Sequence, residues 1–160
     1  MFLKEMIDRW GKVETVLTEF KELSQATVLD VEKDANKIQL MTTNGLYMLE
    51  HGQDCCESVY IEDIVGGELK DLIGEKILWA EESTNVDESY TDGLLMWTFY
   101  TIRTNKVTIT LRWCGESNGY YSVDVDTLRA KDSKAMLKWW REKEETLELY
   151  NKSYKDRLFE

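Results

Sequence analysis

The sequence predicts an α+β fold: a single domain over residues 1–160, in which a mostly antiparallel sheet of five to seven strands is flanked by an N-terminal and a C-terminal amphipathic helix. Three observations support this prediction. Both ends of the chain have apolar residues at helical spacing, the middle has β-branched residues in alternation, and short Asn and Gly turns separate its apolar runs. A chain of this length buries roughly 70% of its unfolded surface, so it needs neither metal nor disulfide to form a core.

Apolar spacing predicts the two terminal helices. Residues 2–23 repeat apolar side chains every three or four positions, and residues 131–158 return to the same spacing. We expect Trp10 and Trp140 to lie in the core and Trp139 or Tyr154 to be exposed partner contacts. The two stripes consist of Leu3, Met6, Ile7, Trp10, Val13, Leu17 and Phe20, and of Met136, Trp140, Leu147, Tyr150, Tyr154 and Leu158.

Residues 27–126 have the pattern of a sheet. The pair Asn44-Gly45 between KIQLMTT and LYMLEH predicts a hairpin. A second hairpin is expected about Thr104-Asn105, between LLMWTFYTIRT and KVTITLRWC. KILWAEES and GYYSVDVD are further predicted strands, SVYIEDIVGG is a strand or a short helical turn, and STNVDESYTDG is a polar loop. ELKDLIG predicts one helical turn that ends at Gly74.

Acidic residues concentrate in one segment. The net charge is −11, and between Glu50 and Asp92 there are 13 acidic residues against only Lys70 and Lys76. The rest of the chain has 18 acidic and 18 basic residues and is neutral. Such a field repels nucleic acid and lipid headgroups and attracts a basic protein surface, so we expect no direct binding to nucleic acid or membrane. The alternative is a solvated face that only maintains solubility.

The segment HGQDCCE contains the only histidine and two of the three cysteines. Imidazole and thiolate together favour zinc, so we expect a structural zinc site here. Cys114 ends a later predicted strand, and two sheet ends can meet in space. In the alternative, Cys56 and Cys114 are small buried hydrophobes, and His51 is a turn residue bonded to a backbone carbonyl. The predicted ligands are His51, Cys55 or Cys56, and Cys114, with Asp54, Asp63 or water closing the site.

Catalysis has little support in the sequence, and we expect no enzyme. A single histidine excludes two-histidine chemistry, and the chain has no Gly-x-Ser-x-Gly elbow, Gly-rich phosphate loop or deaminase signature. A cysteine nucleophile with His51 as base would have no evident oxyanion hole. The remaining catalytic alternative is a zinc-dependent hydrolase with Glu57 or Asp63 as the base.

The runs HGQDCCESVYIEDIVGGELKDLIGEKILWAEE, WTFYTIRT and VTITLRWCGESNGYYSVDVD resemble a family of small acidic proteins of tailed phages and mobile elements, most of which have no known activity. The resemblance covers residues 27–126 and leaves both terminal helices outside. It depends on two motifs, carried here by His51, Cys55, Cys56, Glu57, Ser58, Val59, Tyr60, Ile61, Glu62 and Asp63, and by Gly115, Ser117, Asn118, Gly119, Tyr120, Tyr121 and Ser122.

The resemblance implies a function, because small, acidic, metal-containing proteins of mobile elements include anti-CRISPR inhibitors. We therefore expect a zinc-containing anti-CRISPR protein in the cytoplasm of a bacterial host that binds a Cas9-type effector nuclease and blocks loading or cleavage of target DNA. An inhibitor of another host defence or restriction system, or an immunity-type protein, would need the same acidic face. The residues expected to bind the partner are Glu62, Asp63, Glu81, Glu82, Asp87 and Glu88.

Overall fold

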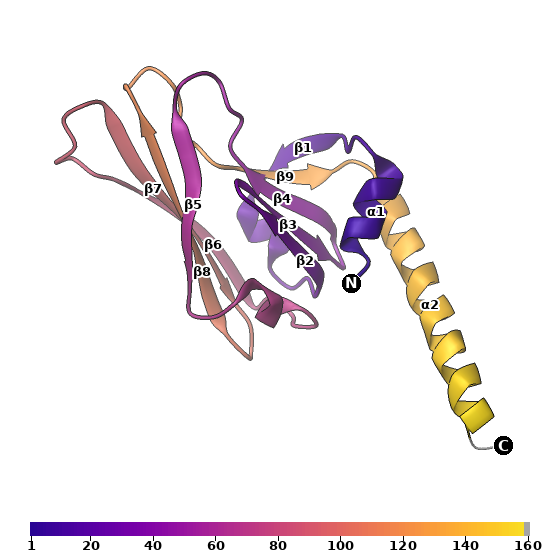
Figure 1. The fold of residues 1–160 in the computed structure, drawn as a ribbon. Helices are drawn as coiled ribbons and strands as arrows, with labels where there is room; N and C mark the ends of the chain where they lie inside the picture. The colour runs from indigo at the N-terminus through magenta and orange to yellow at the C-terminus, as the bar shows by residue number, and fades with distance from the viewer. Residues whose placement is uncertain (159–160) are drawn as a thin grey trace.

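A computed structural model describes residues 1–158 and gives an α+β fold with nine strands in that range. The strands form two antiparallel sheets, and an α-helix lies at each end of the described chain (Figure 1). In chain order the elements are α1 (Leu3–Trp10), β1 (Thr15–Thr18), η1 (Phe20–Leu23), β2 (Val28–Asp34), β3 (Lys37–Thr42), β4 (Gly45–Glu50), β5 (Ser58–Val65), η2 (Leu69–Leu72), β6 (Trp79–Val86), β7 (Leu94–Arg103), β8 (Thr108–Ser117), β9 (Asp126–Ala130) and α2 (Ser133–Leu158), where η marks a 3₁₀ turn.

The elements stack in three layers (Figure 1). The five-stranded sheet, in the order β1-β9-β4-β3-β2, is the middle layer. The four-stranded sheet, in the order β5-β8-β7-β6, packs against one of its faces, and both helices pack against the other. The middle sheet is therefore covered on both sides, while the described helices leave the outer face of the four-stranded sheet uncovered.

Two apolar clusters fill the spaces between the layers. Tyr47, Tyr100 and Trp113 are fully buried between the sheets, and Phe20 lies against Tyr100 with ring centroids 4.6 Å apart. The Tyr100 hydroxyl donates to the Val125 carbonyl oxygen at 3.0 Å, so this polar atom is not left unpaired in the core. The second cluster, on the helix side, includes Met6, Met41, Met48, Met136 and Trp140.

The predicted N-terminal helix over residues 2–23 is wrong beyond Trp10. Gly11 ends α1 because it adopts φ of 64°, a conformation that glycine accepts without a Cβ clash. The β-branched residues that follow then pair with β9 as strand β1, and Leu17 at 72% exposed is outside the core. The apolar spacing beyond Trp10 matched a helix by coincidence. The chain instead passes through β1 and η1, which bring Phe20 back to the core.

Other predictions agree with the structure. The α+β class, the antiparallel pairing and the terminal helices are confirmed, as are the hairpins of β3 with β4 and of β7 with β8.

The strands differ from the prediction in number and grouping. The described residues form nine strands in two sheets, in place of five to seven strands in one. GYYSVDVD is not a strand. Residues 118–125 cross from the four-stranded to the five-stranded sheet, and β9 begins at Asp126.

Within residues 1–158, no helix is both long and apolar enough to cross a membrane.

Gly115 lies where the crossover after β8 packs closely on that strand. A Cβ added there would lie 2.6 Å from the Val123 Cβ, and Val123 is only 2% exposed. We expect Gly115→Ala to lower the free energy of unfolding by about 1–3 kcal/mol, the usual cost of overpacking. Urea denaturation checks this, with Gly52→Ala as the matched control because a Cβ at Gly52 meets nothing within 4 Å. Equal stability of the two variants would contradict the close packing.

Candidate functional site

His51 and Glu57 form a buried pair where the chain crosses between the sheets. Residues 51–57 connect β4 to β5, and residues 118–125 connect β8 to β9. The His51 Nε2 lies 2.9 Å from the Glu57 Oε2, and its Nδ1 lies 2.6 Å from the Asp124 carbonyl oxygen. The two side chains are 6% and 0% exposed. The pair therefore joins the two crossovers through one imidazole ring.

The carboxylate of Glu57 is surrounded by donors from its own loop. The backbone N–H of Cys55 donates to Oε1 at 2.8 Å, and that of Asp54 donates to Oε2 at 3.1 Å. Gln53 donates from Nε2 to Oε1 at 3.0 Å. The Cys55 N–H, together with His51 and the Asp54 N–H, lowers the pKa of Glu57 from 4.5 to about 2, although burial opposes this shift. Glu57 is therefore an ionised acceptor at neutral pH.

The partners of His51 leave neither ring nitrogen open. The Asp124 carbonyl oxygen and the ionised Glu57 carboxylate lie within hydrogen-bond distance of Nδ1 and Nε2. A metal ion at either nitrogen would have to displace one of these contacts. The contact with the Asp124 carbonyl agrees with the alternative expectation that His51 is a turn residue bonded to the backbone.

The three cysteines do not surround His51. Cys55 and Cys56 are bonded to each other as a disulfide at the tip of the loop. Cys114 lies on β8 beside Tyr60 of β5 and Trp97 of β7, where it is 4% exposed. Burial raises the pKa of the Cys114 thiol, which disfavours the thiolate that a metal requires.

The residues predicted to bind zinc do not fit a zinc site in this arrangement. Among the residues that the structure describes, no group of three or more His, Cys, Asp or Glu side chains is placed to hold a metal ion. The imidazole nitrogens face acceptors, and two of the candidate sulfurs are joined to each other. The zinc site stays a prediction from the sequence.

The acidic residues predicted to bind a partner lie on both edges of the four-stranded sheet. Glu62 and Asp63 lie at a bulge in the edge strand β5, and Asp63 pairs with Arg112 at 3.3 Å. On the opposite edge, β6 carries Glu81 on the outer face. Glu82 lies on the inner face, where its Oε1 lies 3.3 Å from the Tyr100 hydroxyl oxygen and burial raises its pKa.

The turn after β6 completes this edge. The hydroxyl and backbone N–H of Ser89 donate to Asp87 at 2.6 and 3.0 Å and lower the pKa of Asp87. Glu88 beside it is exposed. These two acids line one shallow hollow with Trp97 of β7, so the acidic turn is continuous with the sheet's outer face.

An aromatic surface lies between the acidic edges, and the sequence predictions missed it. Side chains alternate along a strand, so the register places one row from each strand on the outer face. We call the aromatic, arginine and valine side chains on this outer face the aromatic face. Trp79 and Tyr60 are 46% and 37% exposed. The aromatic face consists of Tyr60, Val65, Trp79, Trp97, Phe99, Arg103 and Arg112.

The rings and guanidinium groups of the aromatic face are in contact with one another. Trp97 and Phe99 stack with an interplanar angle of 4° and centroids 6.4 Å apart. Arg112 lies over Trp97 at 5.1 Å and Arg103 over Trp79 at 5.4 Å, both within range for cation–π attraction. The segment LLMWTFY could have indicated this face. Its residues other than Thr98 are apolar, so apolar side chains lie on both faces of one strand.

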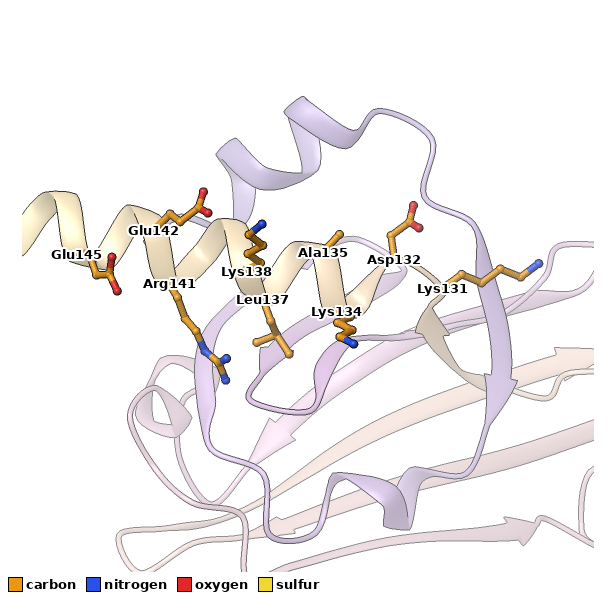
Figure 2. Close-up of a pocket in the computed structure, with 9 residues that line it drawn as sticks. All are labelled: Lys131, Asp132, Lys134, Ala135, Leu137, Lys138, Arg141, Glu142 and Glu145. Carbon is orange, nitrogen blue, oxygen red and sulfur yellow. The ribbon is translucent and has the colours of Figure 1, made fainter.

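A second unpredicted feature is a hollow along the first half of α2, lined by charged side chains of both signs and shown in Figure 2. Lys134, Leu137 and Arg141 point to one side of the helix there, while Lys138 and Glu142 point to the other. In the sequence, the spacing of Lys134, Lys138 and Arg141 by four and three residues could have indicated that these side chains lie together on the helix. Trp139 is not a free aromatic, because it packs edge-on against Trp10 with centroids 6.1 Å apart.

Residues 1–158 form a three-layer α+β protein in which they leave one sheet face uncovered. Its residues 12–127 match the family described as Domain of unknown function (DUF7448), and the chain belongs to that family. The match includes β1 to β8 and the crossover to β9, and it leaves out α1 and α2. No curated protein matches the chain. No solved structure matches it either.

Glu57→Gln tests the buried pair. Because the folded pKa of about 2 lies below the ordinary 4.5, ionised Glu57 stabilises the fold fully above pH 4.5, and this contribution is lost as the pH falls toward 2. We expect the variant to have a lower Tm at pH 7 and a flatter fall of Tm between those two values. Thermal scans across that range, with Asp54→Asn as control, check this. Wild-type pH dependence in Glu57→Gln would contradict it.

The zinc prediction has its own test. Protein purified without a histidine tag and under reducing conditions is analysed for bound metal. About one zinc per chain, lost both in His51→Ala and in a Cys55→Ser, Cys56→Ser variant, would support the predicted site. A ratio far below one in the wild type would end the zinc hypothesis.

Proposed function

We propose that this protein is a binding module that docks on another protein through the aromatic face, and that it inhibits that partner. The observation that carries the proposal is the solvent-facing group of Trp79, Trp97, Phe99 and Arg112 on the one sheet face that the described helices leave uncovered. A sheet face that is only solvated normally carries polar side chains. An aromatic and arginine cluster is instead typical of the centre of a protein interface.

The distribution of charge also fits an interface. Apolar rings occupy the middle strands, while Asp63 on one edge and Glu81 on the other lie outside them. This order, an apolar centre with a charged rim, is that of specific protein–protein interfaces. The central rings would supply affinity by excluding water, and the rim would set orientation and the rate of association.

The acidic rim selects for a basic partner. The segment from Glu50 to Asp92 carries the whole net charge of −11, and it contains both edge strands of the four-stranded sheet. A surface of this sign repels phosphates and attracts a protein groove that normally binds them. The partner class that fits is therefore a protein that handles nucleic acid.

The particular partner we propose is a Cas9-type effector nuclease, and the action is anti-CRISPR inhibition. Such an effector holds its guide and target in a positively charged channel, which matches the acidic rim in sign. The resemblance of residues 27–126 to small acidic proteins of phages and mobile elements supports this choice. Zinc is not required, because the aromatic face is built by strand pairing. Another defence or restriction nuclease is the alternative partner.

Truncating the centre of the face tests its role. We expect a Trp97→Ala, Phe99→Ala variant to bind the effector at least about tenfold more weakly, as central aromatic anchors do. Calorimetric titration of the effector with and without guide RNA, alongside a DNA cleavage assay, measures this. Tyr120→Ala is the control, since Tyr120 is 84% exposed but lies in the crossover after β8. Wild-type protein that leaves DNA binding and cleavage unchanged at excess would refute inhibition of that nuclease.

Charge reversal tests the rim separately. Glu81→Lys with Glu88→Lys should slow association, and the difference from wild type should shrink at high salt because exposed charges are screened there. Stopped-flow association rates at low and high ionic strength provide the measurement. Reversal of Glu142 on α2, outside the rim, is the control. Equal rates for all three proteins at low salt would leave the acids only a role in solubility.

A further inference from the structure

The long helix α2 extends past the body of the protein (Figure 1). Its first half is anchored: Met136 and Trp140 are buried, and Phe2 packs edge-on against Trp140 with centroids 5.3 Å apart. The Lys143 Nζ donates to the Glu5 Oε1 of α1 at 2.6 Å. Beyond Lys143 every described residue of the helix is exposed.

The apolar stripe of the anchored half continues into this projecting half. Leu147, Tyr150, Tyr154 and Leu158 follow Trp140 at helical spacing, so they lie on the same side of the helix as the residues that pack on the sheet. They are 37%, 61%, 52% and 61% exposed. A stripe of this kind along a helix is the seam by which two helices pack.

The charges beside the stripe change sign along the helix. Residues 142–148 contain four glutamates and one lysine, whereas residues 152–157 contain three basic residues and one aspartate. Helical geometry places Glu144, Glu148 and Lys155 on one flank of the stripe. In a parallel pair of helices, each of these charged residues would lie at the same height as the identical residue of the other copy. In an antiparallel pair the order is reversed, so opposite charges lie close together.

We propose that the projecting half of α2 is a docking surface for the same helix of a second copy, in antiparallel orientation. When Leu147 of one copy packs beside Tyr154 of the other, Lys155 of the second copy lies between the levels of Glu144 and Glu148 of the first, and the symmetry repeats this contact. Glu144 already accepts a hydrogen bond from the Trp140 Nε1 at 3.0 Å, which orients it while leaving lone pairs free.

The antiparallel arrangement also suits the shape of the chain. Pairing residues 143–158 uses about 24 Å of helix, and it places the two bodies at opposite ends of the pair. The strongly acidic sheets of the two copies are then far apart, so their repulsion is screened by salt. Each copy keeps its aromatic face free, and a dimer would present two of them.

Sedimentation equilibrium of the full chain across the micromolar range tests the stripe. We expect the wild type to dimerise and Leu147→Glu to weaken dimerisation by about tenfold or more, because a carboxylate would replace an apolar side chain in the seam. Leu149→Glu is the matched control, since Leu149 is 69% exposed on the opposite side of the same helix. A wild type that stays monomeric, or equal effects of the two variants, would overturn the proposal.

A charge swap tests the orientation. Lys155→Glu should weaken the dimer at low salt, and adding Glu144→Lys and Glu148→Lys to it should restore association, because opposite charges then face each other again. Lys152→Glu, away from the stripe, should have little effect. Failure of the swapped variant to recover would exclude the antiparallel contact. Loss of dimers in Trp97→Ala, Phe99→Ala but not in Leu147→Glu would assign self-association to the aromatic face instead.

Discussion

The carboxylate of Glu57 holds together the two crossovers on which the order of the layers depends. It accepts hydrogen bonds from the loop before β5 and from His51, whose other nitrogen reaches the segment after β8. A buried charge is tolerated only when it is paired and hydrogen-bonded, and Glu57 has donors for both oxygens. Because the pair ties residues 51–57 to residues 118–125, it fixes how the four-stranded sheet leaves and rejoins the five-stranded one. The second sheet packs by one face only, because the apolar cluster that contains Tyr100 and Trp113 lies on that face.

That one-sided packing is what makes a binding surface available. The helices pack on the far side of the five-stranded sheet, so neither of them covers Trp97, Phe99 and their neighbours. The family match covers β1 to β8 and the crossover to β9 and leaves the helices out, which separates the matched sheet region from the two helical ends. In the proposed function the matched sheet region binds the partner through its aromatic face. The projecting half of α2 then gives this chain a separate means of self-association.

Local patterns predicted the elements better than their arrangement. The Asn44-Gly45 hairpin and the helix over residues 131–158 follow from turn chemistry and apolar spacing, and both are present. The predicted helix over residues 2–23 ends early, because Gly11 adopts a positive φ although seven apolar residues fit helical spacing. HGQDCCE contains the buried pair that the structure shows, whereas its zinc site stays a prediction. The partner of His51 is Glu57, and the backbone amides that bind this carboxylate leave no trace in a sequence. The aromatic face was missed because alternation shows which residues share a face, not which face is left uncovered.

The lone histidine allows a direct test of the central claim, because its ring nitrogens give the only imidazole signals in a ¹⁵N NMR spectrum. If His51 bridges Glu57 and the Asp124 carbonyl, both nitrogens are occupied, and added zinc will leave their shifts unchanged. In Glu57→Gln the Nε2 signal should change most. A zinc-shifted nitrogen in the wild type would contradict the account and would restore HGQDCCE as a metal site.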